Sequence, residues 1–81
     1  MAELGGSLSA AFGSWTGRVA SFDDQVGAGS VRADGTDEVW YFHCTRIADG
    51  SRQIAEGAWV SFDVHPGPTG LEAVDLRRRT T

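Results

Sequence analysis

The sequence predicts an all-β fold, a small closed barrel of five short strands in one domain. Three observations support this fold class. Short runs of β-branched and aromatic residues recur along the chain, turns rich in Gly, Asp and Pro separate them, and 11 of the 81 residues are Gly. A chain of this length forms a single domain, and closing its sheet removes exposed strand edges.

The first 15 residues differ from the rest of the chain because they are rich in Gly, Ser and Ala. Four apolar residues in this segment are spaced as on one face of a helix: Leu4, Leu8, Phe12 and Trp15. A helix of about two turns is unstable unless it packs on a domain. We therefore expect residues 1–15 to form an N-terminal extension, either flexible or a short helix, and residues 16–79 to form the barrel.

The first three strands are expected in close succession. The first, Thr16–Asp23, carries Val19 and Phe22 and ends in the turn sequence Asp-Asp-Gln-Val-Gly. The second is Ala28–Ala33, and the Asp-Gly pair that follows it is a strong indicator of a hairpin. The third, Glu38–Cys44, is an aromatic and β-branched run.

The last two strands follow a longer connection over Thr45–Gly57. The fourth is expected over Ala58–His65. The sequence Pro-Gly-Pro-Thr-Gly then forms a turn, and Leu71–Arg77 is the fifth strand.

Alternation along the third strand places aromatic residues on both of its faces. Trp40, Phe42 and Cys44 point one way, whereas Tyr41 and His43 point the other way. If the first set fills the barrel, Tyr41 and His43 stand outside on the sheet, where exposed rings serve as stacking platforms for nucleobases. Two interpretations stay open: a binding platform, or a patch covered by the N-terminal segment.

In their order, these segments resemble the bacterial cold-shock domain family. The resemblance spans about residues 16–76 and rests on five motifs: TGRVASFD from Thr16, GAGSV from Gly27, WYFHC from Trp40, EGAWVSF from Glu56 and GLEAVDL from Gly70. It implies a five-stranded antiparallel OB-type Greek-key barrel that binds single-stranded RNA or DNA.

The resemblance is stronger in the barrel than on the binding face. Core-type positions are kept at Val19, Val31, Phe42, Val60, Phe62, Val64 and Val74, and turn glycines at Gly27, Gly29 and Gly35. On the first strand, Ala20 and Ser21 replace the family's Lys and Trp. On the second strand, Ala28 and Ser30 replace its two exposed aromatic residues, and Cys44 replaces the Phe that follows its His.

Of the family's binding face, Phe22, Tyr41 and His43 carry over. Stacking of one base on an aromatic ring contributes about 1–3 kcal/mol. Because the four lost contacts are not independent, we take the low end of their sum, which predicts affinity lower by roughly a thousandfold. Arg32 and Arg52 lie beside loops that rim the expected face and are the candidates for phosphate contact. The run Arg77–Arg79 either contacts phosphate or keeps the chain end solvated.

Charge limits the kind of binding that can be expected. The net charge is −4, the sequence pI is about 4.8, and all seven basic residues are Arg. Residues 1–40 hold two Arg and six acidic residues, whereas residues 41–81 hold five of each. This composition argues against binding driven mainly by electrostatics but is compatible with stacking.

The sequence gives little support for a catalytic or metal-binding site or for a secreted or membrane protein. Cys44 and His43 are expected on opposite faces of a strand, and with His65 they lack metal-ligand spacing, so we expect no catalytic site, metal or cofactor. A single cysteine, no long apolar run and no secretory signal favour a cytoplasmic protein.

Two functions remain from the sequence. The first is a module that binds single-stranded RNA or DNA weakly and in a salt-dependent manner, in transcription or translation. The second is a protein-interaction or regulatory module on the same barrel that has lost nucleic-acid binding. The target and the oligomeric state stay open.

Overall fold

Five strands and a short 3₁₀ turn form a closed barrel in the computed structural model, which describes residues 13–68 and 70–79. The elements are β1 (Ser14–Asp23), β2 (Ala28–Ala33), β3 (Val39–His43), η1 (Cys44–Arg46), β4 (Trp59–Gly67) and β5 (Gly70–Arg78). The all-β barrel predicted from the sequence is therefore confirmed. Leu4, Leu8 and Phe12 of the expected helical face lie outside the described residues.

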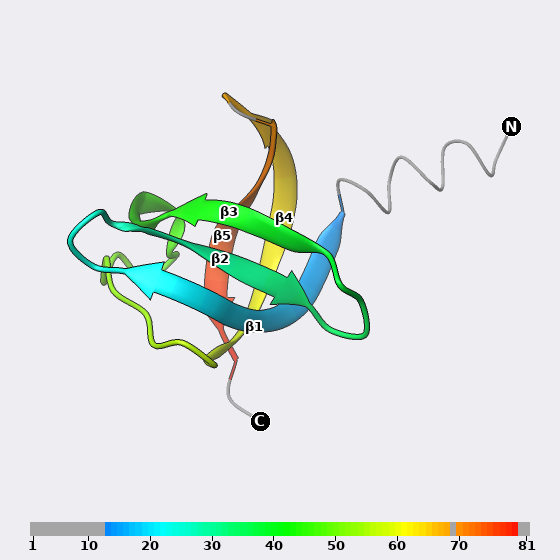
Figure 1. Ribbon diagram of the computed structural model, residues 1–81, viewed down its shortest axis with the longest axis horizontal. Coiled ribbons are helices and arrows are strands. Elements are labelled where there is room, and N and C mark those ends of the chain that lie inside the picture. The colour runs from blue at the N-terminus through cyan, green and yellow to red at the C-terminus, as the bar shows by residue number, and fades with distance from the viewer. Residues whose placement is uncertain (1–12, 69, 80–81) are drawn as a thin grey trace, which may run out of the picture.

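The strands pair in the order β1-β2-β3-β5-β4, and β1 closes the barrel against β4. Figure 1 shows β1, β2 and β3 side by side, with β4 and β5 crossing behind them. The pairs are antiparallel except for β3 and β5, which run in parallel through the register pair Tyr41 and Glu72. Ile47 and Leu76 extend this parallel seam by one bridge.

Strand β1 is long because it pairs with two neighbours. Its first half, from Ser14, pairs with β4, and its second half pairs with β2. Gly17 lies where the two pairings overlap, and a Cβ there would collide with the carbonyl oxygen of Arg32. A bulge between Val19 and Ser21 lets the strand bend. The strand begins two residues earlier than expected, so Trp15 belongs to the barrel.

The end of β1 and both ends of β2 match the expected positions, and the ends of β3, β4 and β5 differ from them by one or two residues. Strand β3 stops at His43 because η1 starts at Cys44. Strands β4 and β5 extend toward each other until Gly67 pairs with Gly70.

Apolar side chains from all five strands fill the barrel. Trp40 is 8% exposed, and Phe42 and Phe62 are fully buried. Trp15 packs on Trp40 with their ring centroids 5.0 Å apart. Burial of a side chain of this kind stabilises the fold by about 1.5–3 kcal/mol, and six of the seven expected core positions are buried.

Val74 is the exception, because it is only partly buried. Asp75 adopts the left-handed backbone conformation, with φ at 54°. The β4–β5 register shifts beside it, so the irregularity resets the alternation of β5. Ala73 and Leu76, both fully buried, supply the inward side chains.

Within the described ranges there is no helix long and apolar enough to cross a bilayer.

Candidate functional site

The outward-facing side chains of β1, β2 and β3 make up one side of the barrel, here called the outer wall. The strand registers arrange them in three cross-strand rows: Asp23, Ala28 and His43; Ser21, Ser30 and Tyr41; and Arg18, Arg32 and Val39. Tyr41 and His43 therefore lie next to small residues on β2, and Arg32 lies two residues from Ser30 along the same strand.

Tyr41 presents its ring to solvent from the middle of β3. It is 44% exposed, whereas its neighbours Trp40 and Phe42 face the core. The predicted alternation of this strand is thus confirmed. An exposed ring on a rigid strand is pre-positioned to stack on a flat ligand.

His43 ends β3, and its ring is fixed by the turn that follows. The Nδ1 atom accepts a hydrogen bond from the backbone N–H of Thr45, at 3.2 Å, and lies 2.9 Å from the Thr45 hydroxyl oxygen. This bond caps η1 and assigns the ring proton to Nε2. The exposed ring can therefore stack on a base and donate a hydrogen bond from Nε2.

Next to the two rings, the outer wall carries small side chains on β1 and β2. The hydroxyl oxygens of Ser21 and Ser30 lie 2.8 Å apart and hydrogen-bond to each other. Asp23, in the row of His43, accepts hydrogen bonds from the backbone N–H groups of Gln25 and Val26 at 3.0 and 3.2 Å. This carboxylate holds the β1–β2 turn and places negative charge at that end of the wall.

Phe22 does not share a face with Tyr41 and His43. Its register partner is Gly29, which pairs in turn with the buried Phe42. The rings of Phe22 and Phe42 stack with their centroids 5.8 Å apart and their planes 12° apart. The expectation that Phe22 borders the Tyr41 platform therefore needs correction, because its side chain lies on the inner side of β1.

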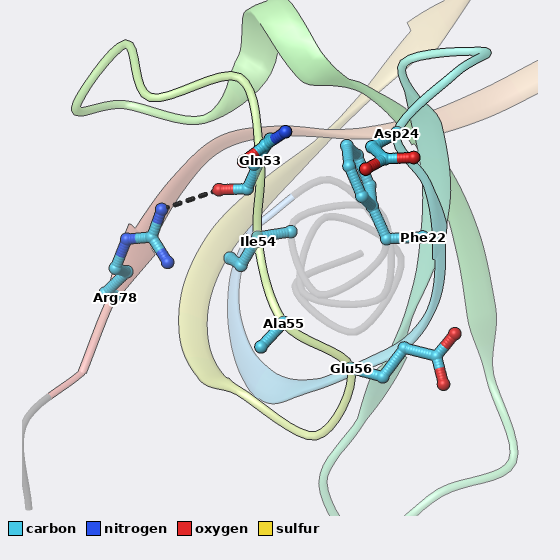
Figure 2. Close-up of a pocket in the computed structure, with 7 residues that line it drawn as sticks. All are labelled: Phe22, Asp24, Gln53, Ile54, Ala55, Glu56 and Arg78. Atoms are coloured by element: carbon cyan, nitrogen blue, oxygen red, sulfur yellow. Dashed lines mark hydrogen bonds between the residues drawn. The ribbon is translucent and has the colours of Figure 1, made fainter.

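Phe22 instead lines an open pocket of about 430 Å³ at one end of the barrel. Figure 2 shows it across the opening from Ile54, with Asp24 and Glu56 at the margin. The pocket wall opposite β1 is formed by residues 53–56 of the β3–β4 connection.

The expected phosphate contacts are separated in the structure. Arg32 lies on the outer wall, opposite Arg18 of β1. Arg52 lies in the β3–β4 connection, exposed and with φ at 65°. The structure thus brings Tyr41, His43 and Arg32 onto one surface and leaves Arg52 outside it.

The C-terminal arginines contact the protein's own acidic and polar groups. Arg77 pairs with Asp75. Arg78 donates to the Asp49 carboxylate at 2.8 Å, to the Ser51 hydroxyl at 2.6 Å and to the Gln53 carbonyl at 2.8 Å. The hydrogen bond from Arg78, followed by that from the Ser51 backbone, lowers the pKa of Asp49 from 3.8 to about 2. Arg78 therefore fastens the β3–β4 connection to β5.

Trp59 carries an arrangement that sequence reasoning did not find. It starts β4 and is half-buried, and the guanidinium carbon of Arg18 lies 4.7 Å from the centroid of its ring system. Arg79 approaches the same ring system at 5.2 Å. Alternation with the buried Val60 could have placed Trp59 outside, but its two arginine partners come from distant parts of the chain.

Cys44 is buried and packs near Gly27. Its sulfur lies 4.0 Å from Nδ1 of His43, so the two side chains are closer than the expected opposite-face arrangement allows. The reason is that the strand ends between them. The described part of the chain holds no group of three His, Cys, Asp or Glu side chains arranged for a metal.

Comparisons with known proteins agree with one another. The family model described as 'Cold-shock' DNA-binding domain matches residues 15–79. The chain is 41% identical over 63 residues to the cold shock-like protein CspA of Stigmatella aurantiaca, covering 76% of this chain and 93% of that protein. It is 38% identical over 64 residues to the cold shock-like protein CspG of Shewanella violacea, covering 78% and 91%.

A solved structure, Drosophila Unr CSD456, superposes with a TM-score of 0.70 at 24% identity. The match covers 91% of this chain and 30% of that one, and at this identity it supports the fold alone.

Proposed function

The chain belongs to the 'cold-shock' DNA-binding domain family, and we propose that it binds single-stranded nucleic acid on the outer wall, with Tyr41 and His43 as its stacking rings. The family resemblance inferred from the sequence is confirmed. Proteins of this family bind nucleic acid and are not enzymes, which agrees with the expectation from the sequence.

The exposure of Tyr41 is the observation that carries the proposal. A ring that is 44% exposed on a strand whose other aromatic residues are buried has no packing role that requires its position. His43 follows on the same face, about 7 Å farther along the strand. Two rings at this spacing offer surfaces for two bases of one strand.

Binding is proposed to be weak. Only β3 contributes rings to the outer wall, since Ser21, Ala28 and Ser30 occupy the neighbouring positions. Asp23 places a carboxylate in the row of His43 and repels phosphate there. Few stacking contacts and an acidic chain together give low affinity that falls further as salt rises.

We propose that this activity serves transcription or translation in the cytoplasm. The competing hypothesis keeps the barrel but assigns its wall to a protein partner. It is favoured by Ser21, Ala28 and Ser30, which place small side chains beside the rings where the family has larger ones.

Fluorescence anisotropy with a labelled nine-nucleotide oligothymidine tests the proposal. In low salt, the anisotropy is expected to rise with protein in the micromolar range, and an unlabelled single strand should compete better than a duplex of the same length. No change at high micromolar protein, with the fold verified by circular dichroism, rejects nucleic-acid binding and leaves the protein-interaction hypothesis.

A further inference from the structure

Two arginines face each other directly on the barrel surface. Arg18 of β1 and Arg32 of β2 are register partners, and both are exposed. Within the described part of the chain, neither side chain makes an ion pair or a hydrogen bond. Like charges directly opposite in a sheet destabilise it. A local arrangement that opposes folding is typical of a functional site.

Trp59 holds one of these arginines in place. It is the register partner of Arg18 on the other side of β1, and the Arg18 guanidinium lies over its ring system. Arg79 lies over the same ring system. Stacking on Trp restricts a guanidinium group while leaving its N–H edges able to donate. Trp59 therefore preorganises two of the three arginines in this region.

The region is positively charged on a chain whose net charge is −4. One acidic residue pairs with this region: the Asp34 carboxylate lies 4.0 Å from Arg79 and also accepts a hydrogen bond from the Thr16 hydroxyl at 3.1 Å. Among the described residues, Arg18 and Arg32 form no ion pair, so this contact leaves two of the three arginines Arg18, Arg32 and Arg79 without a paired carboxylate. We call these three residues the arginine strip.

The arginine strip continues the outer wall. Arg32 is two residues from Ser30 along β2, a distance of about 7 Å, and Ser30 is the register partner of Tyr41. From Tyr41, the surface therefore leads over Ser30 to Arg32, on to Arg18 and then to Trp59. At the other end of the outer wall, the Asp23 carboxylate lies in the row of His43 and repels phosphate.

We propose that the arginine strip binds the phosphodiester backbone of the single strand whose bases stack on Tyr41 and His43. The inference rests on the proposed function and extends it by assigning the path that the nucleic-acid strand follows across the barrel surface. Guanidinium groups bind phosphate oxygens through paired N–H donors. The strip thus supplies the phosphate contacts that the acidic end of the wall does not provide.

Salt dependence of binding tests the strip. For single strands, the slope of log K against log salt falls by about 0.7 for each phosphate contact. Arg18→Gln and Arg32→Gln are each expected to flatten the slope for a nine-nucleotide oligothymidine by about 0.7, and the double variant by about 1.4. Arg46→Gln, which removes an exposed arginine of η1 outside the strip, should keep the wild-type slope.

Folding does not confound this comparison. Arg32→Gln relieves like-charge repulsion, so its melting temperature is expected to stay level or rise. Arg18→Gln relieves the same repulsion but loses the contact with Trp59, so its melting curve is measured to show that it is folded before the slopes are compared. One outcome contradicts the role of the arginine strip but leaves the proposed function intact. In it, the wild-type protein binds and Tyr41→Ala weakens binding, but Arg18→Gln and Arg32→Gln both show the same salt dependence as Arg46→Gln. If the wild-type protein does not bind at all, the proposed function fails first.

The position of Trp59 gives a second readout. In protein labelled with 5-fluorotryptophan, the ¹⁹F resonance of Trp59 is identified by its absence in Trp59→Phe. A nine-nucleotide strand is expected to shift this resonance, whereas a trinucleotide that occupies only the two rings leaves it in place. A Trp59 resonance that responds to neither strand, under conditions in which both bind, overturns the inference.

Discussion

Tyr41 and Ser30 lie directly opposite each other on β3 and β2, so an exposed phenol ring borders a hydroxyl group on the outer wall. The hydroxyl of Ser30 bonds in turn to that of Ser21 on β1. The central row of the wall thus contains one ring and two small polar groups. This row explains why a well-formed cold-shock barrel is proposed to bind weakly.

Truncation of the Tyr41 ring is expected to reduce affinity. Tyr41→Ala removes one stacking contact of about 1–3 kcal/mol, which corresponds to a Kd about 5- to 150-fold higher. Tyr41→Phe retains the ring and should bind within a few-fold of the wild-type protein. Anisotropy titrations of both variants with one oligothymidine measure the difference, and equal affinity for Tyr41→Ala and the wild-type protein contradicts the role of the ring.

His43 combines a ring with a cap, and two substitutions separate these roles. His43→Asn keeps a side-chain acceptor for the Thr45 N–H, so stability is expected to hold while affinity falls. His43→Phe keeps a ring but loses the cap, so affinity is retained while the free energy of unfolding drops by about 0.5–2 kcal/mol. Urea denaturation and titration of each variant measure both quantities. The same rank order in the two assays would show that the roles are not separable.

Aromatic residues introduced on β1 and β2 are expected to strengthen binding. Ser30→Phe places a ring beside Tyr41, and Ser21→Trp adds another in the same row. Each new stacking contact should lower the Kd about 5-fold or more. Thr36→Phe, in the β2–β3 turn away from this row, is the control for added hydrophobicity. A gain in the control equal to that of the designed variants argues against stacking as the cause.

The contact between Asp49 and Arg78 predicts a dependence of stability on pH. The pKa of Asp49 is lowered to about 2 in the folded protein, against 3.8 ordinarily, chiefly by the hydrogen bond from Arg78. Its stabilising effect is therefore complete above pH 3.8 and is lost as the pH falls toward 2. Stability of the wild-type protein and Asp49→Asn, measured by urea denaturation across this range, should converge at the acidic end. Curves that stay parallel would exclude the linkage.

The alternation of β3 could be predicted from sequence because it has no irregularity: Trp40 and Phe42 face inward, and Tyr41 and His43 face outward. The faces of Phe22 and Val74 were predicted wrongly because β1 and β5 each contain an irregularity. The bulge between Val19 and Ser21 reverses the faces of the residues that follow. The shift beside Asp75 does the same in β5. Such bulges arise from pairing between strands, so local patterns do not reveal them.

The surface arrangements also depend on contacts between distant segments. The ring system of Trp59 lies near Arg18 and Arg79, which are about 40 residues before it and 20 after it in the chain. Arg78 reaches Asp49 across a separation of 29 residues. The sequence could predict that each arginine is exposed but not which acidic residue or aromatic ring it contacts. That information comes from the closure of the barrel, which brings β1, β4 and β5 together.

The most direct measurement of the central claim is an aromatic ¹H–¹³C NMR titration with a pyrimidine-rich single-stranded DNA. The ring signals of Tyr41 and His43 should shift progressively as the strand is added, by more than those of the buried Trp40 and Phe42. Binding that leaves the Tyr41 and His43 signals in place would contradict the account, because the strand would then occupy another surface.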